Sequence, residues 1–212
     1  ITMLDVGQGD SFVFDYNDKC FIIDGGGDYK RELGEGTGKN VLYPYLKYMG
    51  TDYVDAIFIT HTDADHIKGI IEILDYVKTG KIYVSNKNDE SDLYKILCEK
   101  ARMTNTEIVE ICSGARIKFR DDIIIDCIYP YSSDMTGNDA SLVLKVVFDN
   151  TSFLFTGDIS AECEKEIIDS GENIKADVFK NTLVRAPLFP ETRRPLCYIL
   201  FSLLQMCQKS FL

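Results

Sequence analysis

Short apolar runs separated by polar turns make up much of the first part of the chain. Four of these runs have the length and residue types of β-strands, and they cover residues 1–6, 11–15, 20–23 and 56–59. Two longer segments, 41–49 and 67–77, instead carry apolar residues at helical spacing. Gly50 directly follows the first of them, as expected at the end of a helix. The pattern predicts strands and helices mixed within one domain.

The second part of the chain continues in the same way. Predicted strands cover residues 81–84, 106–111, 115–119, 123–128, 141–148 and 152–155, and predicted helices cover 91–102 and 161–168. Ser91 is the expected cap of the first of these helices. Asp149-Asn150 is the expected turn of a hairpin. Strand-rich halves with helices on the outside indicate an α/β sandwich.

Composition limits the class of protein. The chain has 212 residues, of which 45% are hydrophobic and 27% charged, so we expect one sizeable core and no intrinsic disorder. Its formal net charge of −11 would repel nucleic acid and anionic lipid unless bound cations offset it. The seven cysteines are odd in number and lack a C-x-x-C spacing, which argues against a disulfide framework or a thiolate zinc site. Reduced cysteines favour a cytoplasmic location.

The two ends of the chain raise separate expectations. The sequence opens with Ile1 inside an expected strand, so we expect the natural N-terminus to be missing, together with any targeting or membrane segment. No stretch within the chain is apolar over a length that predicts a membrane-spanning helix. The last residues, 196–212, are apolar without clean periodicity. An ordinary terminal helix and an aberrant end are both compatible with that pattern.

The most informative segment is His61-Thr62-Asp63-Ala64-Asp65-His66, between a predicted strand and a predicted helix. It contains both histidines of the chain, and they flank two aspartates. Alternate residues of an extended loop face the same way, so His61 and Asp63 can bind one cation. Asp65 and His66 can reach a second cation where the helix begins. Such imidazole and carboxylate ligands suit Zn²⁺, Mn²⁺ or iron. The alternative is a polar loop in which Asp65 caps the helix.

This segment resembles the H-x-H-x-D-H signature of hydrolases with the metallo-β-lactamase fold, in a variant with Asp at the second position. Three further segments are similar to one branch of that family, which includes the C-terminal domain of the competence protein ComEC and its free-standing relatives. They are Leu4-Asp5-Val6-Gly7-Gln8-Gly9-Asp10-Ser11, Asn138-Asp139-Ala140-Ser141-Leu142-Val143-Leu144 and Leu154-Phe155-Thr156-Gly157-Asp158. The resemblance extends over residues 1–180 and implies one domain there, a metallo-β-lactamase-like αββα sandwich.

The resemblance also implies metal ligands. His61 and Asp63 would bind the first cation, and Asp65 and His66 the second. Asp158 would bridge both cations. Taken from the sequence alone, a helix cap explains Asp158 about equally well.

Other polar residues are weaker candidates for the same cleft. Asn138 stands where many relatives have a third ligand to the first metal, and Asp24 precedes two glycines that would leave room for a cleft. Turn formation is an alternative role for both residues. Asp5, Gln8 and Asp10 are expected to brace the opening loop beneath the metals.

The implied function is metal-assisted hydrolysis with one or two divalent cations, Zn²⁺ or Mn²⁺. Such cations lower the pKa of a bound water from ~15.7 toward ~7 and polarise the scissile bond. Asp65 would orient the water or accept its proton. The resemblance suggests a phosphoester substrate, as for a phosphodiesterase or a nuclease-like enzyme. A small phosphoester or another small substrate also fits the acidic charge, and nucleic acid follows from the resemblance only.

The chain departs from this branch after Lys180. Relatives carry a His-His-Gly-Ser element shortly after Ala-Asp-Val-x-Lys, but here 176–180 is followed by Asn181-Thr182-Leu183-Val184, without a histidine. We therefore expect a fold that is incomplete at its C-terminus, with an atypical tail over 181–212. A shifted reading frame is one explanation of that tail. The alternative function is a catalytically impaired or inactive remnant that keeps the fold but lacks the last metal-binding histidine.

Overall fold

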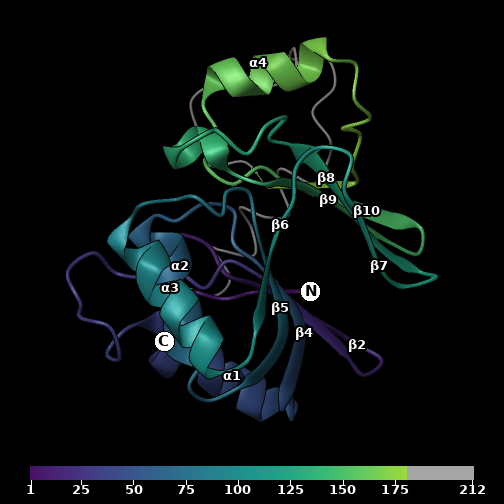
Figure 1. Cartoon of the computed structure of the whole chain (residues 1–212). Coiled ribbons are helices and arrows are strands. Elements are labelled where there is room, and N and C mark those ends of the chain that lie inside the picture. Colours follow the sequence, from purple (N-terminus) through teal and green to yellow (C-terminus); the bar gives the residue numbers. More distant parts are fainter. Residues whose placement is uncertain (181–212) are drawn as a thin grey trace.

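Residues 1–180 are described by a computed structural model, in which two sheets pack face to face (Figure 1). The first sheet has six strands in sequence order. They are β1 (Thr2–Met3), β2 (Phe12–Tyr16), β3 (Lys19–Ile23), β4 (Tyr53–Phe58), β5 (Lys78–Val84) and β6 (Glu107–Glu110). The β2–β3 hairpin turns at Asn17 and Asp18, both with positive φ, and strands β3 to β6 run parallel.

The second sheet has five strands in the order β11-β10-β9-β8-β7. They are β7 (Arg116–Arg120), β8 (Ile123–Tyr129), β9 (Val143–Phe148), β10 (Thr151–Phe155) and β11 (Val178–Lys180). Strands β7 to β10 are antiparallel neighbours, and β11 lies parallel to β10. This parallel pairing brings the end of β11 next to the end of β10, because Phe155 pairs with Lys180.

Helices cover the outer faces of both sheets. The first sheet is covered by α1 (Tyr43–Met49), α2 (Ala64–Ile73) and α3 (Asp92–Met103), and the second by α4 (Ala161–Asp169) (Figure 1). A π-helical turn (Gly38–Leu42) precedes α1, and a 3-10 turn (Gly137–Ala140) precedes β9. The order helix, sheet, sheet, helix is the αββα sandwich that the sequence predicted, and this part of the prediction is confirmed.

Alternating side chains of the first sheet contribute to two different cores. On β4, Ile57 packs against the helices, whereas Phe58 packs between the sheets. On β3, Ile22 faces the helices and Phe21 the second sheet. All four side chains are at most 2% exposed. Each fully buried side chain of this size stabilises the fold by roughly 1.5–3 kcal/mol. Burial on both faces of β3 and β4 therefore fixes the positions at which these two strands end.

Most of the predicted elements are present, with shifts at their ends. Gly50 ends α1 with φ of 75°, and Ser91 caps α3 by accepting a hydrogen bond from the Tyr94 amide at 3.3 Å. The expected turn at Asp149-Asn150 joins β9 to β10. The first strand is shorter than predicted, and α2 begins at Ala64 rather than at residue 67. Strand β11 was not predicted at all.

Two sequence-based expectations concern the limits of the domain. The expected tail over 181–212, with its absent histidine and its shifted-frame explanation, lies outside the described residues. No helix among residues 1–180 is long and apolar enough to cross a membrane.

Candidate metal centre

The two histidines lie on a loop that leads from β4 into α2. The Ile59 amide donates to the carbonyl of Tyr83 on β5, so the loop keeps the direction of the strand for one more residue. Asp63 is the N-cap of α2 and has an extended backbone, which turns the chain into the helix. As a result His61 precedes the helix and His66 lies in its first turn. Their side chains are 2% and 1% exposed.

The two imidazole rings face each other. Their centroids are 4.1 Å apart, and the planes are inclined by 47°. Each Nδ1 has a partner: His66 Nδ1 lies 2.9 Å from Asp24 Oδ2, and His61 Nδ1 lies 3.1 Å from the Thr60 hydroxyl. Because a carboxylate only accepts hydrogen bonds, Nδ1 of His66 carries a proton. The Thr60 hydroxyl already donates to Asp24, so it accepts from Nδ1 of His61.

Asp24 is the hub of these contacts. It directly follows β3, is fully buried and has a φ of 56°, a left-handed conformation that Asp tolerates better than most residues. Its carboxylate accepts hydrogen bonds from the Thr60 amide at 2.8 Å, from the Thr60 hydroxyl at 2.7 Å and from His66. Asp24 therefore fixes the orientation of both rings, one directly and one through Thr60.

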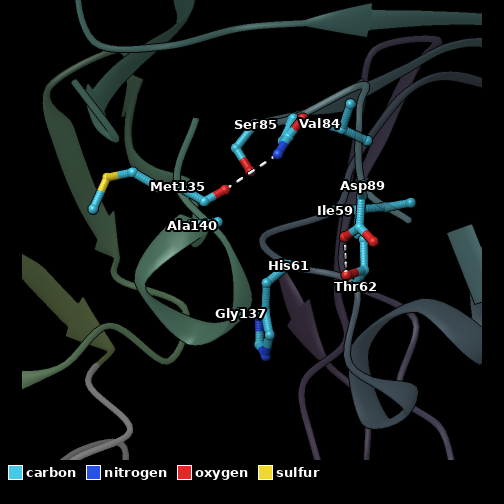
Figure 2. Close-up of a pocket in the computed structure, with 10 residues that line it drawn as sticks. Ile59, His61, Thr62, Val84, Ser85, Asp89, Met135, Gly137 and Ala140 are labelled. Atoms are coloured by element: carbon cyan, nitrogen blue, oxygen red, sulfur yellow. Dashed lines mark hydrogen bonds between the residues drawn. The ribbon is translucent and has the colours of Figure 1, made fainter. Parts of the chain in front are cut away.

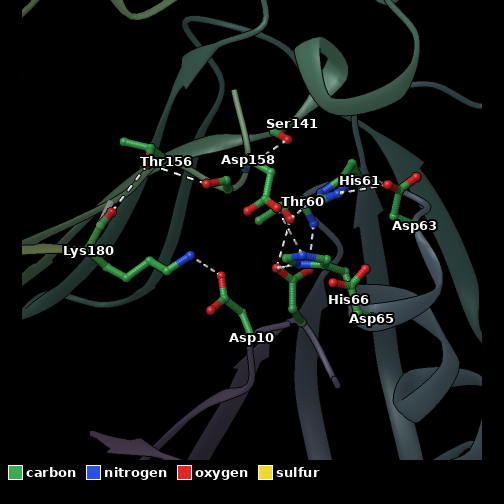
Figure 3. A network of polar contacts seen from close by, with 12 residues as sticks. Asp10, Thr60, His61, Asp63, Asp65, His66, Ser141, Thr156, Asp158 and Lys180 are labelled. Carbon is green, nitrogen blue, oxygen red and sulfur yellow. Dashed lines mark hydrogen bonds and ion pairs between the residues drawn. The ribbon is translucent and has the colours of Figure 1, made fainter. Parts of the chain in front are cut away.

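Asp158 approaches the histidines from the second sheet. It follows β10, and its amide donates to the Ser141 hydroxyl at 3.2 Å. Its Oδ2 lies 3.7 Å from His66 Nε2. Figure 3 shows the Asp158 side chain beside the two histidines. The N-cap of α4 is Ser160, whose hydroxyl accepts from the Cys163 amide, so the helix-cap alternative for Asp158 does not hold.

These groups meet the requirements of a cation site. The ligand atoms of His61, His66 and Asp158 all lie within 4.8 Å of one another. His66 Nε2 is buried and has no hydrogen-bond partner within the described residues. A buried polar atom without a partner costs free energy, and a cation shared with His61 and Asp158 would satisfy it.

The protonation of His61 and His66 also favours a cation site. Burial lowers the pKa of His61, and the neighbouring His66 lowers it further. Burial also acts against a charge on His66, but Asp24, Asp158 and Asp10 outweigh burial and raise the pKa of His66 to about 11. The pair therefore favours one positive charge between the rings. A divalent cation would take the place of that proton.

Comparison with known proteins agrees with this geometry. Residues 4–92 match the model of the metallo-beta-lactamase superfamily. The chain is 32% identical over 196 residues to ComE operon protein 3 of Bacillus subtilis, an alignment that covers 85% of this chain. The chain carries a metallo-β-lactamase superfamily domain. It spans 24% of the length of ComE operon protein 3.

Solved structures show the same fold. A metallo-beta-lactamase HARLDQ motif mutant from Cronobacter sakazakii superposes with a TM-score of 0.54 at 13% identity, over 80% of this chain and 70% of that one. CmlA, a diiron β-hydroxylase from Streptomyces venezuelae, has a TM-score of 0.54 at 18% identity, over 84% of this chain and 33% of that one. Proteins of the metallo-β-lactamase fold bind divalent metals and are mostly metal-dependent hydrolases, and this domain has candidate His and Asp ligands for one.

Two predicted ligands of the metallo-β-lactamase domain lie at the rim of the centre. Asp63 Oδ2 is 3.8 Å from His61 Nε2, with 44% of its side chain exposed. Asp65 lies in the first turn of α2, so it is not the residue that caps this helix. Its Oδ1 instead accepts a hydrogen bond from the Tyr29 hydroxyl at 2.9 Å. Burial and the contact with Asp65 both raise the pKa of Tyr29, which keeps this hydroxyl a donor at neutral pH.

The weaker candidates lie beside or beneath the centre. Asn138 is exposed in the 3-10 turn, where its carbonyl accepts from the Ser141 amide at 2.9 Å. Asp10 is buried, forms an ion pair with Lys180 at the end of β11, and accepts from the Gly26 amide through its carbonyl. Asp10, Asp24 and His66 also have ligand atoms within 4.8 Å of one another. Because the Asp24 carboxylate already accepts hydrogen bonds from Thr60, we assign this second group to holding His66 in place and not to a second cation.

The opening loop contributes less than expected. Asp5 accepts a hydrogen bond from the Gly7 amide at 3.2 Å and is exposed, which is a local turn contact. Of the three bracing residues predicted in this loop, Asp10 is the one that the structure brings to the histidines. Tyr29 and Lys180, which also reach the site, were not identified from the sequence.

One side of the centre is closed. A cavity of only about 10 Å³ lies behind His61, which is the space of about one water (Figure 2). Two contacts close this side: the Thr62 hydroxyl donates to Asp89 at 2.5 Å, and the Asn86 amide group donates to the carbonyl of Met135 at 3.2 Å. Asp63, Asp65 and Tyr29 are half-buried or exposed, and they form a more accessible side of the centre.

Proposed function

We propose that this domain is a metal-dependent hydrolase of phosphoester bonds. The observation that carries the proposal is the convergence of two buried imidazoles and one carboxylate on a single point, with His66 Nε2 left without a hydrogen bond within the described residues. The family supports hydrolysis, and the resemblance to the competence-protein branch supports a phosphoester. An overall charge of −11 favours a small substrate over a long nucleic acid.

His61, His66 and Asp158 are the residues that would hold the cation, with Asp63 at its exposed side. When bound, the cation supplies an activated water near neutral pH and Lewis acidity toward an ester oxygen. Zn²⁺ and Mn²⁺ suit these ligands. We assign Asp65 to orienting the attacking water, because its carboxylate is at the open side of the centre and Tyr29 fixes one of its oxygens.

Asp24 keeps both Nε2 atoms directed at the cation. With Nδ1 of each ring engaged, Nε2 is the nitrogen left for coordination, and on His66 a cation would take the place of the Nε2 proton. Such outer contacts fix the orientation of each ring before a cation arrives.

A second candidate function is a module that binds one cation and catalyses no reaction. The observation that favours it is the histidine count, because the whole chain has two histidines and both are in the 61–66 segment. No further imidazole is then available for a second cation. The two candidates differ in metal content and in turnover.

The test combines metal content, folding and hydrolysis. Purified wild-type chain is loaded with Zn²⁺ or Mn²⁺, and bound metal is counted by mass spectrometry. We expect one or two ions per chain and hydrolysis of bis(p-nitrophenyl) phosphate. His66→Ala should lose the metal and the hydrolysis while keeping its far-UV circular dichroism. Unchanged metal content in this variant would overturn the assignment, and metal binding without hydrolysis in the wild type would favour the second candidate.

Asp158→Asn separates catalysis from folding. If Asp158 binds the cation, the variant should lose at least ~10-fold in turnover, as loss of a metal ligand or of its close support does. The urea midpoint should fall little, because Ser160 and not Asp158 caps α4. Equal turnover in variant and wild type would contradict the assigned role.

A further inference from the structure

Tyr29 combines an exposed ring with a fixed hydroxyl. The residue is 58% exposed, yet its hydroxyl donates to Asp65 Oδ1 at 2.9 Å. Asp65 is in the first turn of α2, one residue before His66. A large aromatic ring is thus held beside Asp65, at the accessible rim of the centre.

The loop that carries Tyr29 is anchored to the same helix. Lys68 on α2 donates to the carbonyl oxygens of Asp28 and Arg31, each at 2.9 Å, on either side of Tyr29. Further along the loop, the Glu72 carboxylate accepts from the amides of Gly34 and Gly36. The ring is therefore positioned relative to Asp65 and His66 by contacts to one rigid element.

The segment before Tyr29 packs closely against α2. A Cβ atom on Gly27 would lie 1.8 Å from the Ala64 carbonyl oxygen, so this glycine packs its backbone directly against the start of the helix. The Gly69 amide also donates to the Gly26 carbonyl at 2.9 Å. These contacts make Tyr29 a preformed surface that a ligand does not have to order.

We propose that Tyr29 is the platform on which a nucleobase of the phosphoester substrate stacks. This inference rests on the proposed function, and it names the substrate class as a nucleotide. The chain is acidic, and two of the cations near Tyr29 are engaged within the protein: Lys68 by the loop carbonyls and Arg31 by Asp28 at 3.4 Å. Stacking on an aromatic side chain does not need a nearby positive charge. Every nucleobase has a flat face that can stack in this way.

A tryptophan at position 29 makes stacking directly visible. The chain has no tryptophan, so Tyr29→Trp introduces a single indole at the rim of the centre. We expect thymidine 5′-monophosphate to quench its fluorescence saturably in the presence of Mn²⁺, and deoxyribose 5-phosphate, which lacks the base, to quench it far less. Tyr48→Trp is the control, because Tyr48 is 86% exposed on α1, away from the centre; it should not respond.

Binding calorimetry separates the ring from its hydroxyl. Tyr29→Phe keeps the ring and loses the hydrogen bond to Asp65, whereas Tyr29→Leu loses both. Stacking predicts that the Leu variant binds thymidine 5′-monophosphate at least ~5-fold more weakly than the Phe variant, since stacking is worth about 1–3 kcal/mol. Equal weakening in both variants assigns Tyr29 to bracing Asp65 and overturns the platform, as does equal quenching by the base-free phosphate or no quenching at all.

The outcome for the proposed function is read separately. Hydrolysis of a phosphodiester by the metal-loaded wild type, with no quenching at position 29, removes the platform and leaves the function. Quenching by the nucleotide, with no hydrolysis and no dependence on His66, supports the platform and removes the function.

Discussion

A single buried carboxylate, that of Asp24, controls both imidazoles of the centre. It binds His66 directly and reaches His61 through the Thr60 hydroxyl. Because one side chain sets two ring orientations, its loss should affect metal affinity more than the loss of a contact to one ligand. The same carboxylate is the largest influence that raises the pKa of His66.

Asp24→Asn should weaken binding of Zn²⁺ by about 10–100-fold, the usual cost of a lost carboxylate behind a metal-binding histidine. The Asn side chain offers one acceptor and one donor, so its NH₂ group would face either the Thr60 amide or the Nδ1 proton of His66. Competition with a chromophoric chelator measures the apparent Kd.

Asp55→Asn is the matched control for this substitution. Asp55 on β4 has a side chain 12% exposed and accepts from the Lys19 ammonium at 2.6 Å and from the Cys20 amide at 3.0 Å. The control should lose stability but keep the Kd for Zn²⁺ within about twofold. Similar losses of affinity in both variants would show a general effect of destabilisation instead of a specific one.

The sequence could predict the candidate metal ligands but not the residues that orient them. His61 and His66 stood out through residue type and spacing. Asp24 was assigned mainly to a turn, because its partners Thr60 and His66 come from a segment 36 and 42 positions later. Tyr29 gave no signal for the same reason: an isolated tyrosine in a polar loop has no periodicity, and its contact with Asp65 exists only after folding.

Helix α2 is the element on which the centre depends. It presents His66 inward, Asp65 at the rim, and on its other turns Lys68 and Glu72 toward the loop. Glu72 is 4% exposed and accepts three backbone amides of that loop, from Gly34, Gly36 and Lys39 at 2.8–3.1 Å. Helix and loop should therefore gain or lose order together.

Glu72→Gln should destabilise the fold by about 1–3 kcal/mol, because the side-chain NH₂ group would face at least one backbone N–H that now has a partner. The urea midpoint measures this loss. The loop should also become the first site of limited proteolysis, near Arg31, as its amide anchors weaken. Glu90→Gln is the control: Glu90 is exposed, and such substitutions usually change stability by less than about 0.5 kcal/mol.

The elements with a clear hydrophobic periodicity were predictable from the sequence. The exceptions have physical reasons. Strand β11 has three half-buried residues and no alternation, and it exists because Phe153 to Phe155 offer it a free edge of β10. Helix α2 begins before its apolar stripe, since Asp63 turns the chain at the N-cap while the first turn still carries polar site residues. The polar residues of this first turn interrupt the apolar pattern there.

For the whole molecule, the charge of −11 and the position of the centre belong together. Asp63, Asp65 and Asp158 surround two histidines that together favour one positive charge. A divalent cation would lower the local excess of negative charge, and without it an anionic phosphoester would be repelled. Turnover should therefore require added metal at every salt concentration that leaves the protein folded.

The last prediction concerns residues 181–187, which lie outside the described residues, and the gene that encodes them. Asn181-Thr182-Leu183-Val184-Arg185-Ala186-Pro187 can be encoded as AAC ACT CTG GTT CGA GCA CCT. Read two bases later, this string gives CAC TCT GGT TCG AGC ACC, or His-Ser-Gly-Ser-Ser-Thr, which is close to the His-His-Gly-Ser element of the relatives. Lys180 and Asn181 can be written AAA AAC, an adenine run in which one base is easily lost.

The position of Lys180 gives this frame change a structural consequence. Lys180 ends β11 and forms an ion pair with Asp10, whose carboxylate has atoms within 4.8 Å of those of Asp24 and His66. One restored adenine would encode Lys-Lys-His-Ser-Gly-Ser after Phe179, so a histidine would follow the strand end beside the centre. The repaired chain should bind more metal and hydrolyse phosphodiesters faster than the present one, as measured by mass spectrometry and turnover. Sequencing the gene decides the premise, because codons for 181–187 that give no histidine in the shifted frame would end the hypothesis.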